Sequence, residues 1–195
     1  DKSSVTNLDK ESEKIIINCI KNRYPHHDII SEESSNFKIG SEYTWMIDPL
    51  DGTHNFINKI PLFTVSIGIY HIDKIVAGII YVPFTSDLYV GHKGHGAYKN
   101  ESRLSVSSKS DISDCAFHFD SGLKKFTKKE YDIISSIAYN SYNNRVLGCS
   151  TLNLALCAEG TIDIIVEFDD YPWDYCSGIL ILNEAGGRVT AINGD

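Results

Sequence analysis

The sequence has little positive charge and lacks any long apolar run. It carries 18 Lys and Arg against 26 Asp and Glu, a formal net charge of −8, and its basic residues cluster only at 124–125 and 128–129. A protein that binds a phosphate backbone needs an extended basic surface, so we do not expect nucleic acid as the main ligand. A small anionic substrate remains compatible with this charge, because bound cations reverse a local field. Because the sequence shows no membrane-spanning apolar stretch and no signal-like start, we expect a soluble, cytoplasmic protein.

The cysteines show no spacing typical of a disulfide framework or a zinc site. They are odd in number, scattered, and without a Cys-x-x-Cys pair: Cys19, Cys115, Cys149, Cys157 and Cys176. Structural zinc sites and disulfide-rich domains both depend on close, regular spacing. The seven histidines form no ligand set either. We therefore expect buried, reduced thiols.

The length of 195 residues and a hydrophobic fraction of 42% allow one domain with a sizeable core. Apolar spacing predicts an amphipathic helix over 9–24, capped by Thr6 and ended by Pro25. β-branched and aromatic runs predict an antiparallel meander, and two shorter runs predict strands before it. The meander strands are expected at 65–70, 75–81 and 88–91, and the shorter strands at 29–30 and 43–47.

The second half of the chain changes character, because helical patterns there alternate with short strands. Helices are expected at 130–142, 151–159 and 174–185, and strands near Ala116, near Val146, at 162–166 and at 189–192. Ser150 or Thr151 is expected to cap the middle helix, and Gly160 and Gly186-Gly187 to end two helices. The pattern predicts an α/β (α+β) fold with layered helices and sheets.

Two acids, Asp48 and Asp51, follow the apolar run 43–47 at the end of a predicted strand. Pro49 and Gly52 fix the backbone around them, so both carboxylates are aimed from a rigid turn. This arrangement is typical of a site for a divalent cation. The alternative is an ordinary Asx turn.

Further acids stand where predicted strands end or helices begin, which is where open α/β sheets bind ligands. Glu32 and Glu33 follow the strand at 29–30, and Asp174 opens the last helix. Glu32 and Glu33 could instead be a pair of solvated loop residues without a ligand, and we favour this interpretation for Glu32. Asp174 also suits a helix N-terminus, whose dipole favours acids.

The segment Ile47–Phe56, IDPLDGTHNF, closely resembles the signature of the inositol monophosphatase family. Trp173–Gly178, followed by Glu184–Gly187, resembles the second signature of that family, more than 100 residues away. Ser31–Ser34 resembles its Gly-Glu-Glu-Ser element with serine in place of glycine, and Thr6–Asp9 its N-terminal Thr-x-x-Asp segment. The resemblance implies alternating helix and sheet layers, similar to fructose-1,6-bisphosphatase. It also implies a single domain over 1–195 that lacks the N-terminal helix and the C-terminal strand and helices of a typical member.

The resemblance implies a Mg²⁺-dependent phosphatase. Mg²⁺ prefers octahedral oxygen coordination with retained waters, which carboxylates and a carbonyl supply better than His or Cys. The implied ligands are Glu33, Asp48 and the Leu50 carbonyl for one ion, Asp48, Asp51 and Asp174 for a second, and Asp9 with Glu33 for a weaker third.

The catalytic groups implied with these ligands are Thr53, Asp9 and Glu33. The expected nucleophile is water, made more acidic by the metal and oriented by the Thr53 hydroxyl, which Asp9 polarises. Taken alone, Asp9 would be a helix cap or a solvated acid. The backbone N–H groups of Gly52 and Thr53 are expected to bind phosphate oxygens.

The expected substrate is a small phosphorylated polyol or sugar, and inositol monophosphate is favoured. Besides the acids and the turn at 51–53, the implied contacts are Gly148, Cys149 and Glu167, the last matching a glutamate that contacts inositol hydroxyls in the family. A small polar residue usually stands at the position of Cys149. Fructose-1,6-bisphosphatase, histidinol-phosphatase and 3'-phosphoadenosine 5'-phosphate phosphatase activities are alternatives. Family members also imply a homodimer and lithium inhibition.

A rival of another class is a regulatory protein of the same fold that binds RNA or the transcription machinery. The charge of −8 and the complete ligand set count against this as the only role.

Overall fold

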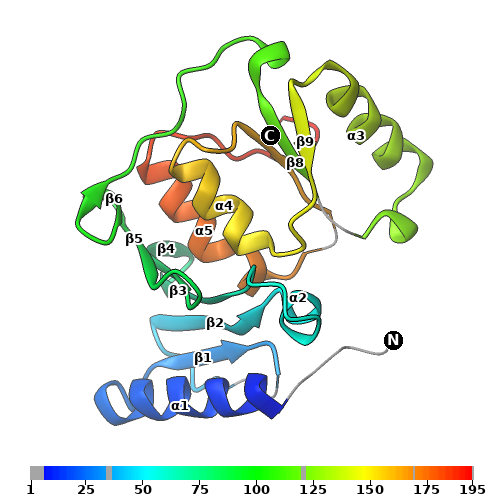
Figure 1. Cartoon of the computed structure of the whole chain (residues 1–195). Coiled ribbons are helices and arrows are strands. Elements are labelled where there is room, and N and C mark those ends of the chain that lie inside the picture. Colours follow the sequence, from blue (N-terminus) through cyan, green and yellow to red (C-terminus); the bar gives the residue numbers. More distant parts are fainter. Residues whose placement is uncertain (1–6, 34–36, 120–121, 169, 195) are drawn as a thin grey trace.

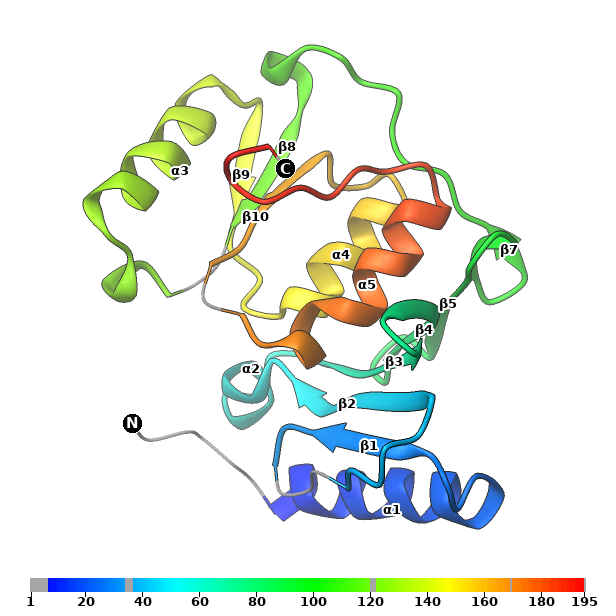
Figure 2. The same ribbon diagram turned by 180° about the vertical axis from the view of Figure 1, so that it is seen from behind.

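The computed structural model describes residues 7–33, 37–119, 122–168 and 170–194, which form five stacked layers of helices and sheets (Figures 1 and 2). In order, the layers are α1 (Asn7–Arg23), a seven-stranded sheet, the pair α4 (Ser150–Ala158) and α5 (Pro172–Glu184), a three-stranded sheet, and α3 (Lys128–Asn140). The predicted mixed α/β layered fold is confirmed. Thr6, the expected cap of α1, lies outside the described residues.

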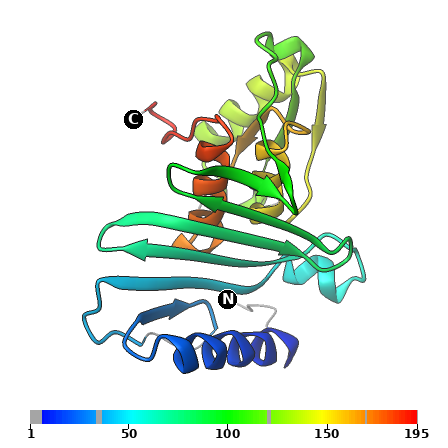
Figure 3. The ribbon, with the colours of Figure 1, turned by 90° about the vertical axis from the view of Figure 1, so that its left-hand side faces the viewer.

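The large sheet follows the chain order from β1 to β7. β1 runs parallel to β2, and each later neighbour is antiparallel, so the predicted meander is confirmed. Figure 3 shows these long hairpins between α1 and α5. The strands are β1 (Asp28–Ser31), β2 (Tyr43–Asp51), β3 (Thr64–His71), β4 (Lys74–Val82), β5 (Asp87–His92), β6 (Gly96–Lys99) and β7 (Ser102–Arg103).

A row of glycines lets α5 lie close against this sheet. Gly68, Gly78 and Gly91 are direct cross-strand partners in β3, β4 and β5. A Cβ at Gly68 would overlap the sulfur of Cys176, and a Cβ at Gly78 would overlap the Ser177 carbonyl. Side chains here would push the helix away, because interiors are packed without spare volume. The glycine row therefore brings the first turn of α5 down to the end of β2.

The smaller sheet is parallel in the order β10–β8–β9, and α4 and α3 contact its strands. Its strands are β8 (Ala116–Phe119), β9 (Asn143–Arg145) and β10 (Ile164–Val166). The helices α3, α4 and α5 lie where their patterns predict them. Gly160 and Gly186, with φ of 79° and 93°, follow α4 and α5 as expected.

Three local expectations are corrected. Residues 189–192 form no strand, because no described strand pairs with them. Cys149 takes the cap position of α4 without a side-chain cap bond, while the Thr151 hydroxyl binds elsewhere. All five cysteines are free, but Cys19 is exposed rather than buried. Within the described ranges, no helix has both the length and the apolar character needed to cross a membrane.

Candidate active site

The irregular end of β2 holds two carboxylates by backbone geometry. The pairing of β2 with β3 shifts register between Asp48 and Asp51. Asp48 is buried, and its Oδ1 accepts a hydrogen bond from the Leu50 N–H at 2.9 Å. Gly52 follows with φ of 84°, and a Cβ there would lie 2.7 Å from the Leu62 carbonyl oxygen. A larger residue at this position would displace the turn.

Four carboxylates interact at this end of the large sheet: Glu32, Asp48, Asp51 and Asp174. Burial, and then the charges of the other three acids, hold the pKa of Asp48 well above its usual range. The surface of Glu32 is open to solvent, yet desolvation by the surrounding protein and the charge of Asp174 raise its pKa to about 7. The charges that act most strongly on both groups are those of other acids. The cluster is therefore short of positive charge.

Asp174 reaches this cluster from the first turn of α5. Pro172 opens that helix, and Asp174 Oδ2 accepts a hydrogen bond from the Tyr171 N–H at 2.8 Å. Asp174 therefore accepts a hydrogen bond at a helix start, as its position predicts, and its charge also acts on the other acids.

Glu32, rather than Glu33, is the acid of its pair that faces Asp48. The parallel pairing of β1 with β2 continues beyond β1, so Glu32 stands beside Asp48. Glu33 lies among different groups, since burial and the charges of Asp9 and Glu13 raise its pKa. This geometry favours Glu32 over Glu33 as the acid that would share an ion with Asp48. Glu32 is exposed, as expected for a solvated loop acid, but it also interacts with the acid cluster.

Thr53 and Asp9 meet although 44 residues separate them. Thr53 opens the short helix α2 (Thr53–Ile57), and Asp9 is buried in the first turn of α1. Thr53 Oγ1 lies 3.0 Å from the Leu50 carbonyl oxygen and 3.4 Å from Asp9 Oδ1. One hydroxyl proton serves one acceptor at a time. The Thr53 proton therefore has two alternative acceptors beside the turn.

The start of α4 binds the carboxylate of Asp51. Its Oδ2 accepts hydrogen bonds from the Thr151 N–H at 2.7 Å, the Thr151 hydroxyl at 2.6 Å and the Cys149 thiol at 3.2 Å. Burial, and then the charge of Asp51, hold the pKa of Cys149 well above its usual range, so this thiol stays a neutral donor. Sequence reasoning missed Thr151 as a site residue, since its hydroxyl looked like a helix cap.

Asn55 fixes the loop that precedes α4. Its Nδ2 lies 2.7 Å from the Leu147 carbonyl oxygen, 3.2 Å from that of Gly148 and 2.8 Å from that of Leu62. Gly148 turns the chain with φ of 68°. These contacts bring Gly148 and Cys149, two predicted substrate contacts, against the turn that carries Asp51.

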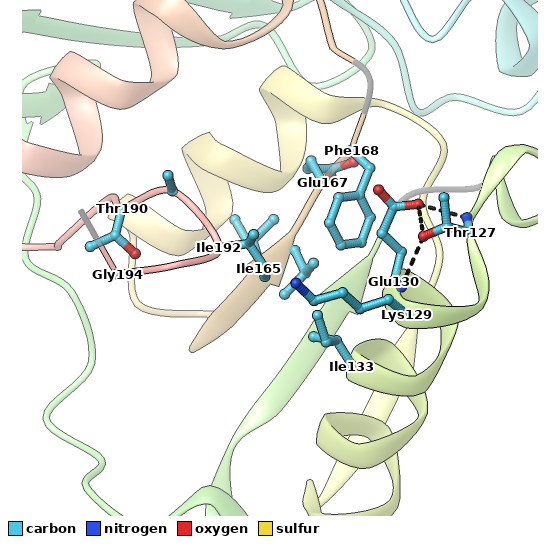
Figure 4. A pocket seen from close by; sticks show the side chains of 12 residues that line it. Thr127, Lys129, Glu130, Ile133, Ile165, Glu167, Phe168, Thr190, Ile192 and Gly194 are labelled. Carbon is cyan, nitrogen blue, oxygen red and sulfur yellow. Dashed lines mark hydrogen bonds between the residues drawn. The ribbon is translucent and has the colours of Figure 1, made fainter.

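Glu167 follows β10 and accepts a hydrogen bond from Asn153 Nδ2 at 2.7 Å. It also lines a cavity of about 550 Å³ between β10, the start of α3 and residues 190–194 (Figure 4). Of the predicted site residues within the described ranges, Glu167 is the one that lines this cavity. This cavity therefore lies beside Glu167, and the four clustered acids do not line it.

The acid cluster suits a hard divalent cation by its chemistry. Its donors are carboxylate oxygens, which Mg²⁺ prefers over the nitrogen and sulfur ligands of zinc sites. In the part of the chain that the structure describes, no three His, Cys, Asp or Glu side chains form a ready ligand set. Asp48, Asp51 and Asp174 accept hydrogen bonds from protein donors instead. A cation would relieve the repulsion that raises the pKa of Glu32 and Asp48.

Known proteins resemble this chain in sequence and in fold. The model of the inositol monophosphatase family matches residues 1–195. The chain is 36% identical, over 98% of its length and 74% of the relative, to a fructose-1,6-bisphosphatase/inositol-1-monophosphatase of Aquifex aeolicus. It is 35% identical, over the same shares, to a putative Nus factor SuhB of Neisseria meningitidis serogroup B. The crystal structure of extragenic suppressor protein suhB from Bartonella henselae superposes with a TM-score of 0.93 at 35% identity, covering 97% of this chain and 74% of that one. The chain belongs to the inositol monophosphatase family.

Proposed function

We propose that the protein is a Mg²⁺-dependent phosphatase that hydrolyses a small phosphate monoester, with inositol monophosphate as the favoured substrate. The observation that carries the proposal is the mutual electrostatic interaction of four acids at one end of the large sheet, namely Glu32, Asp48, Asp51 and Asp174. Membership of the family supports a phosphatase.

The proposed holders of the cation are Glu32, Asp48, Asp51, Asp174 and the Leu50 carbonyl. Asp9 and Glu33 are proposed to bind a further ion or its water, in keeping with the charge of Asp9 that helps to raise the pKa of Glu33. When bound, Mg²⁺ supplies positive charge to the phosphoryl oxygens and makes a water molecule more acidic. The acids themselves contribute negative charge, which gives the site its affinity for the cation.

Thr53 is proposed to orient the attacking water. Its oxygen accepts a hydrogen bond from that water while its own proton points to Asp9 or to the Leu50 carbonyl. The water oxygen then bonds to phosphorus as the ester P–O bond breaks. One proton of the water ends on the leaving oxygen, giving an alcohol, and the other stays on the inorganic phosphate. The N–H groups of Gly52 and Thr53 are proposed to bind phosphate oxygens.

The proposed contacts to the organic part of the substrate are Gly148, Cys149 and Glu167. A carboxylate accepts hydrogen bonds from several hydroxyls, so Glu167 favours a polyol. We also propose, from the family resemblance, inhibition by lithium, a homodimer and a cytoplasmic location.

A second candidate is a binding role in transcription, which the name of the Neisseria relative suggests. A substrate panel separates the two. Inositol monophosphate, fructose 1,6-bisphosphate, histidinol phosphate, 3'-phosphoadenosine 5'-phosphate and an aryl phosphate would be assayed with Mg²⁺ and with a chelator, beside Asp48→Asn. We expect turnover that requires Mg²⁺ and is lost in the variant. No turnover on any of these esters would overturn the phosphatase proposal and favour the binding role.

A further inference from the structure

A chain of three polar side chains, two of them buried, ends at the half-buried Glu167. His118 Nδ1 lies 3.2 Å from Asn153 Oδ1, and Asn153 Nδ2 lies 2.7 Å from Glu167 Oε1. The three residues come from β8, from α4 and from the end of β10, respectively. Only 3% of His118 and 1% of Asn153 are exposed. Nothing in the sequence patterns singled out His118 or Asn153.

The acceptors and donors of this chain fix its direction. An ionised carboxylate only accepts hydrogen bonds, so the Asn153 amide must present its NH₂ group to Glu167. Its oxygen then faces His118, and an amide oxygen also only accepts. Nδ1 of His118 must therefore carry the proton. Burial lowers the pKa of His118, so the ring is neutral near pH 7 and carries that one N–H.

Burial makes each link of this chain necessary. A buried donor or acceptor that loses its partner forfeits its solvation without compensation. If Glu167 turned away, the Asn153 NH₂ group would lose its partner in the interior. If Asn153 turned away, the ring N–H of His118 would lose its partner. The Glu167 carboxylate is thus held from behind by a side chain that has little freedom of its own.

We propose that Asn153 is a positioning residue for substrate recognition: it holds the Glu167 carboxylate towards the hydroxyl groups of a polyol phosphate, and His118 holds Asn153. The inference rests on the proposed function, because Glu167 is a proposed substrate contact. It adds two residues that do not touch the substrate but decide how well a hydroxylated substrate is distinguished from a plain phosphate ester.

The proton position can be measured on the unaltered protein. Nitrogen-15 NMR of the histidines, assigned with His118→Gln, should show Nδ1 of His118 protonated and Nε2 unprotonated at pH 7. A proton on Nε2 would reverse the amide and overturn the inference, whether or not the protein proves to be a phosphatase. Absence of wild-type turnover would instead overturn the proposed function. The proton position on His118 would then still test the hydrogen-bonded chain from His118 to Glu167.

The recognition role is tested with Asn153→Leu, which keeps the shape of the side chain and removes both its donor and its acceptor. We expect the KM for inositol monophosphate to rise about 10-fold, with kcat and the hydrolysis of an aryl phosphate little changed. Asn140→Leu, the same change on α3 where the amide bonds within its own helix, is the matched control and should change nothing.

Combination with Glu167→Ala completes the test. If Asn153 acts through Glu167, adding Asn153→Leu to Glu167→Ala should raise the KM no further. An equal loss on both substrates, or an additive loss in the double variant, would overturn the positioning role. Asn153→Ser serves the same comparison if the leucine variant does not fold, since its shorter side chain does not span both partners.

Discussion

Thr151 and Asp51 are 100 residues apart, yet the hydroxyl and the backbone N–H of Thr151 both donate to one carboxylate oxygen of Asp51, at 2.6 Å and 2.7 Å. The hydroxyl of Thr64 contacts the Thr151 oxygen in turn. Because the Thr151 proton goes to the carboxylate, Thr64 must donate to Thr151. Both threonines are fully buried. This pair of hydroxyls fixes the orientation of the Asp51 carboxylate within the acid cluster.

Thr151→Val should therefore weaken both the fold and the site, because it keeps the branched shape and removes the hydroxyl. We expect the free energy of unfolding to fall by about 1–2 kcal/mol, the cost of unpaired buried polar groups. Mg²⁺ affinity should also fall, since Asp51 gains freedom to turn. Urea unfolding and calorimetric Mg²⁺ titration measure the two effects. Thr151→Ser is the control and should stay near wild type, whereas a valine variant equal to wild type in both would contradict the positioning of Asp51.

Asp174→Asn should lower activity while stabilising the metal-free protein. The charge of Asp174 raises the pKa of Glu32 and Asp48, so removing it relieves repulsion among the acids. We expect turnover to fall by about 100-fold or more, as when one electrostatic stabiliser of a transition state is lost. Thermal unfolding in a chelator should occur at a higher temperature than in wild type, and Mg²⁺ should stabilise the variant less. Asp132→Asn, at an exposed position on α3, is the control. A less stable metal-free variant would contradict the prediction and show that the helix-start contribution of Asp174 outweighs the repulsion among the acids.

The fold was predictable where the signal is local. The apolar residues of the helices predicted at 130–142, 151–159 and 174–185 recur with helical spacing. The three meander strands are β-branched or aromatic runs separated by turn residues. Elements that depend on a partner were not predictable in this way. Residues 189–192 have strand composition but pair with no strand in the part of the chain that the structure describes. The short β6 forms along the edge of β5, and β7 along the edge of β6.

The site, too, was predictable only where its residues are close in sequence. Asp48, Asp51 and Gly52 are adjacent in sequence, and one turn determines how they lie. Which of Glu32 and Glu33 faces them depends on the pairing of β1 with β2, which a single sequence does not specify. The roles of Thr151 and Asn153 depend on the docking of α4 against distant segments.

Stability at acidic pH should depend on Asp163. Burial raises the pKa of this carboxyl, but hydrogen bonds from Lys109, Ser107 and the Ala116 N–H outweigh burial and lower it. A group whose pKa is lower in the folded state stabilises the fold above its unfolded pKa of about 3.9, and this stabilisation is lost as the pH falls. Asp163→Asn should thus cost about 1–3 kcal/mol at pH 7.

Denaturant unfolding between pH 3 and pH 7 tests this dependence. The difference between wild type and Asp163→Asn should shrink below about pH 4, where the Asp163 carboxyl of the unfolded wild-type chain takes up a proton while that of the folded protein does so only at lower pH. Asp73→Asn, in the exposed turn between β3 and β4, should match wild type throughout. A difference that is constant across this range would show that the carboxylate charge of Asp163 does not contribute.

The last prediction concerns the pair Thr53 and Asp9, whose contact of 3.4 Å joins the turn after β2 to α1. Thr53→Ala should lower kcat by about 100-fold with little change in KM, because an orienting hydroxyl acts mainly in the transition state. Asp9→Asn should act in the same direction. The double variant should lose much less than the product of the two single losses, since residues that act as one unit are not additive. Ser12→Ala is the matched control, because the Ser12 hydroxyl bonds the Pro49 carbonyl of the same turn at 3.0 Å without a proposed catalytic role. Multiplicative losses in the double variant would show that Thr53 and Asp9 act separately, and a loss of kcat in Ser12→Ala would attribute the effect to the shape of the turn.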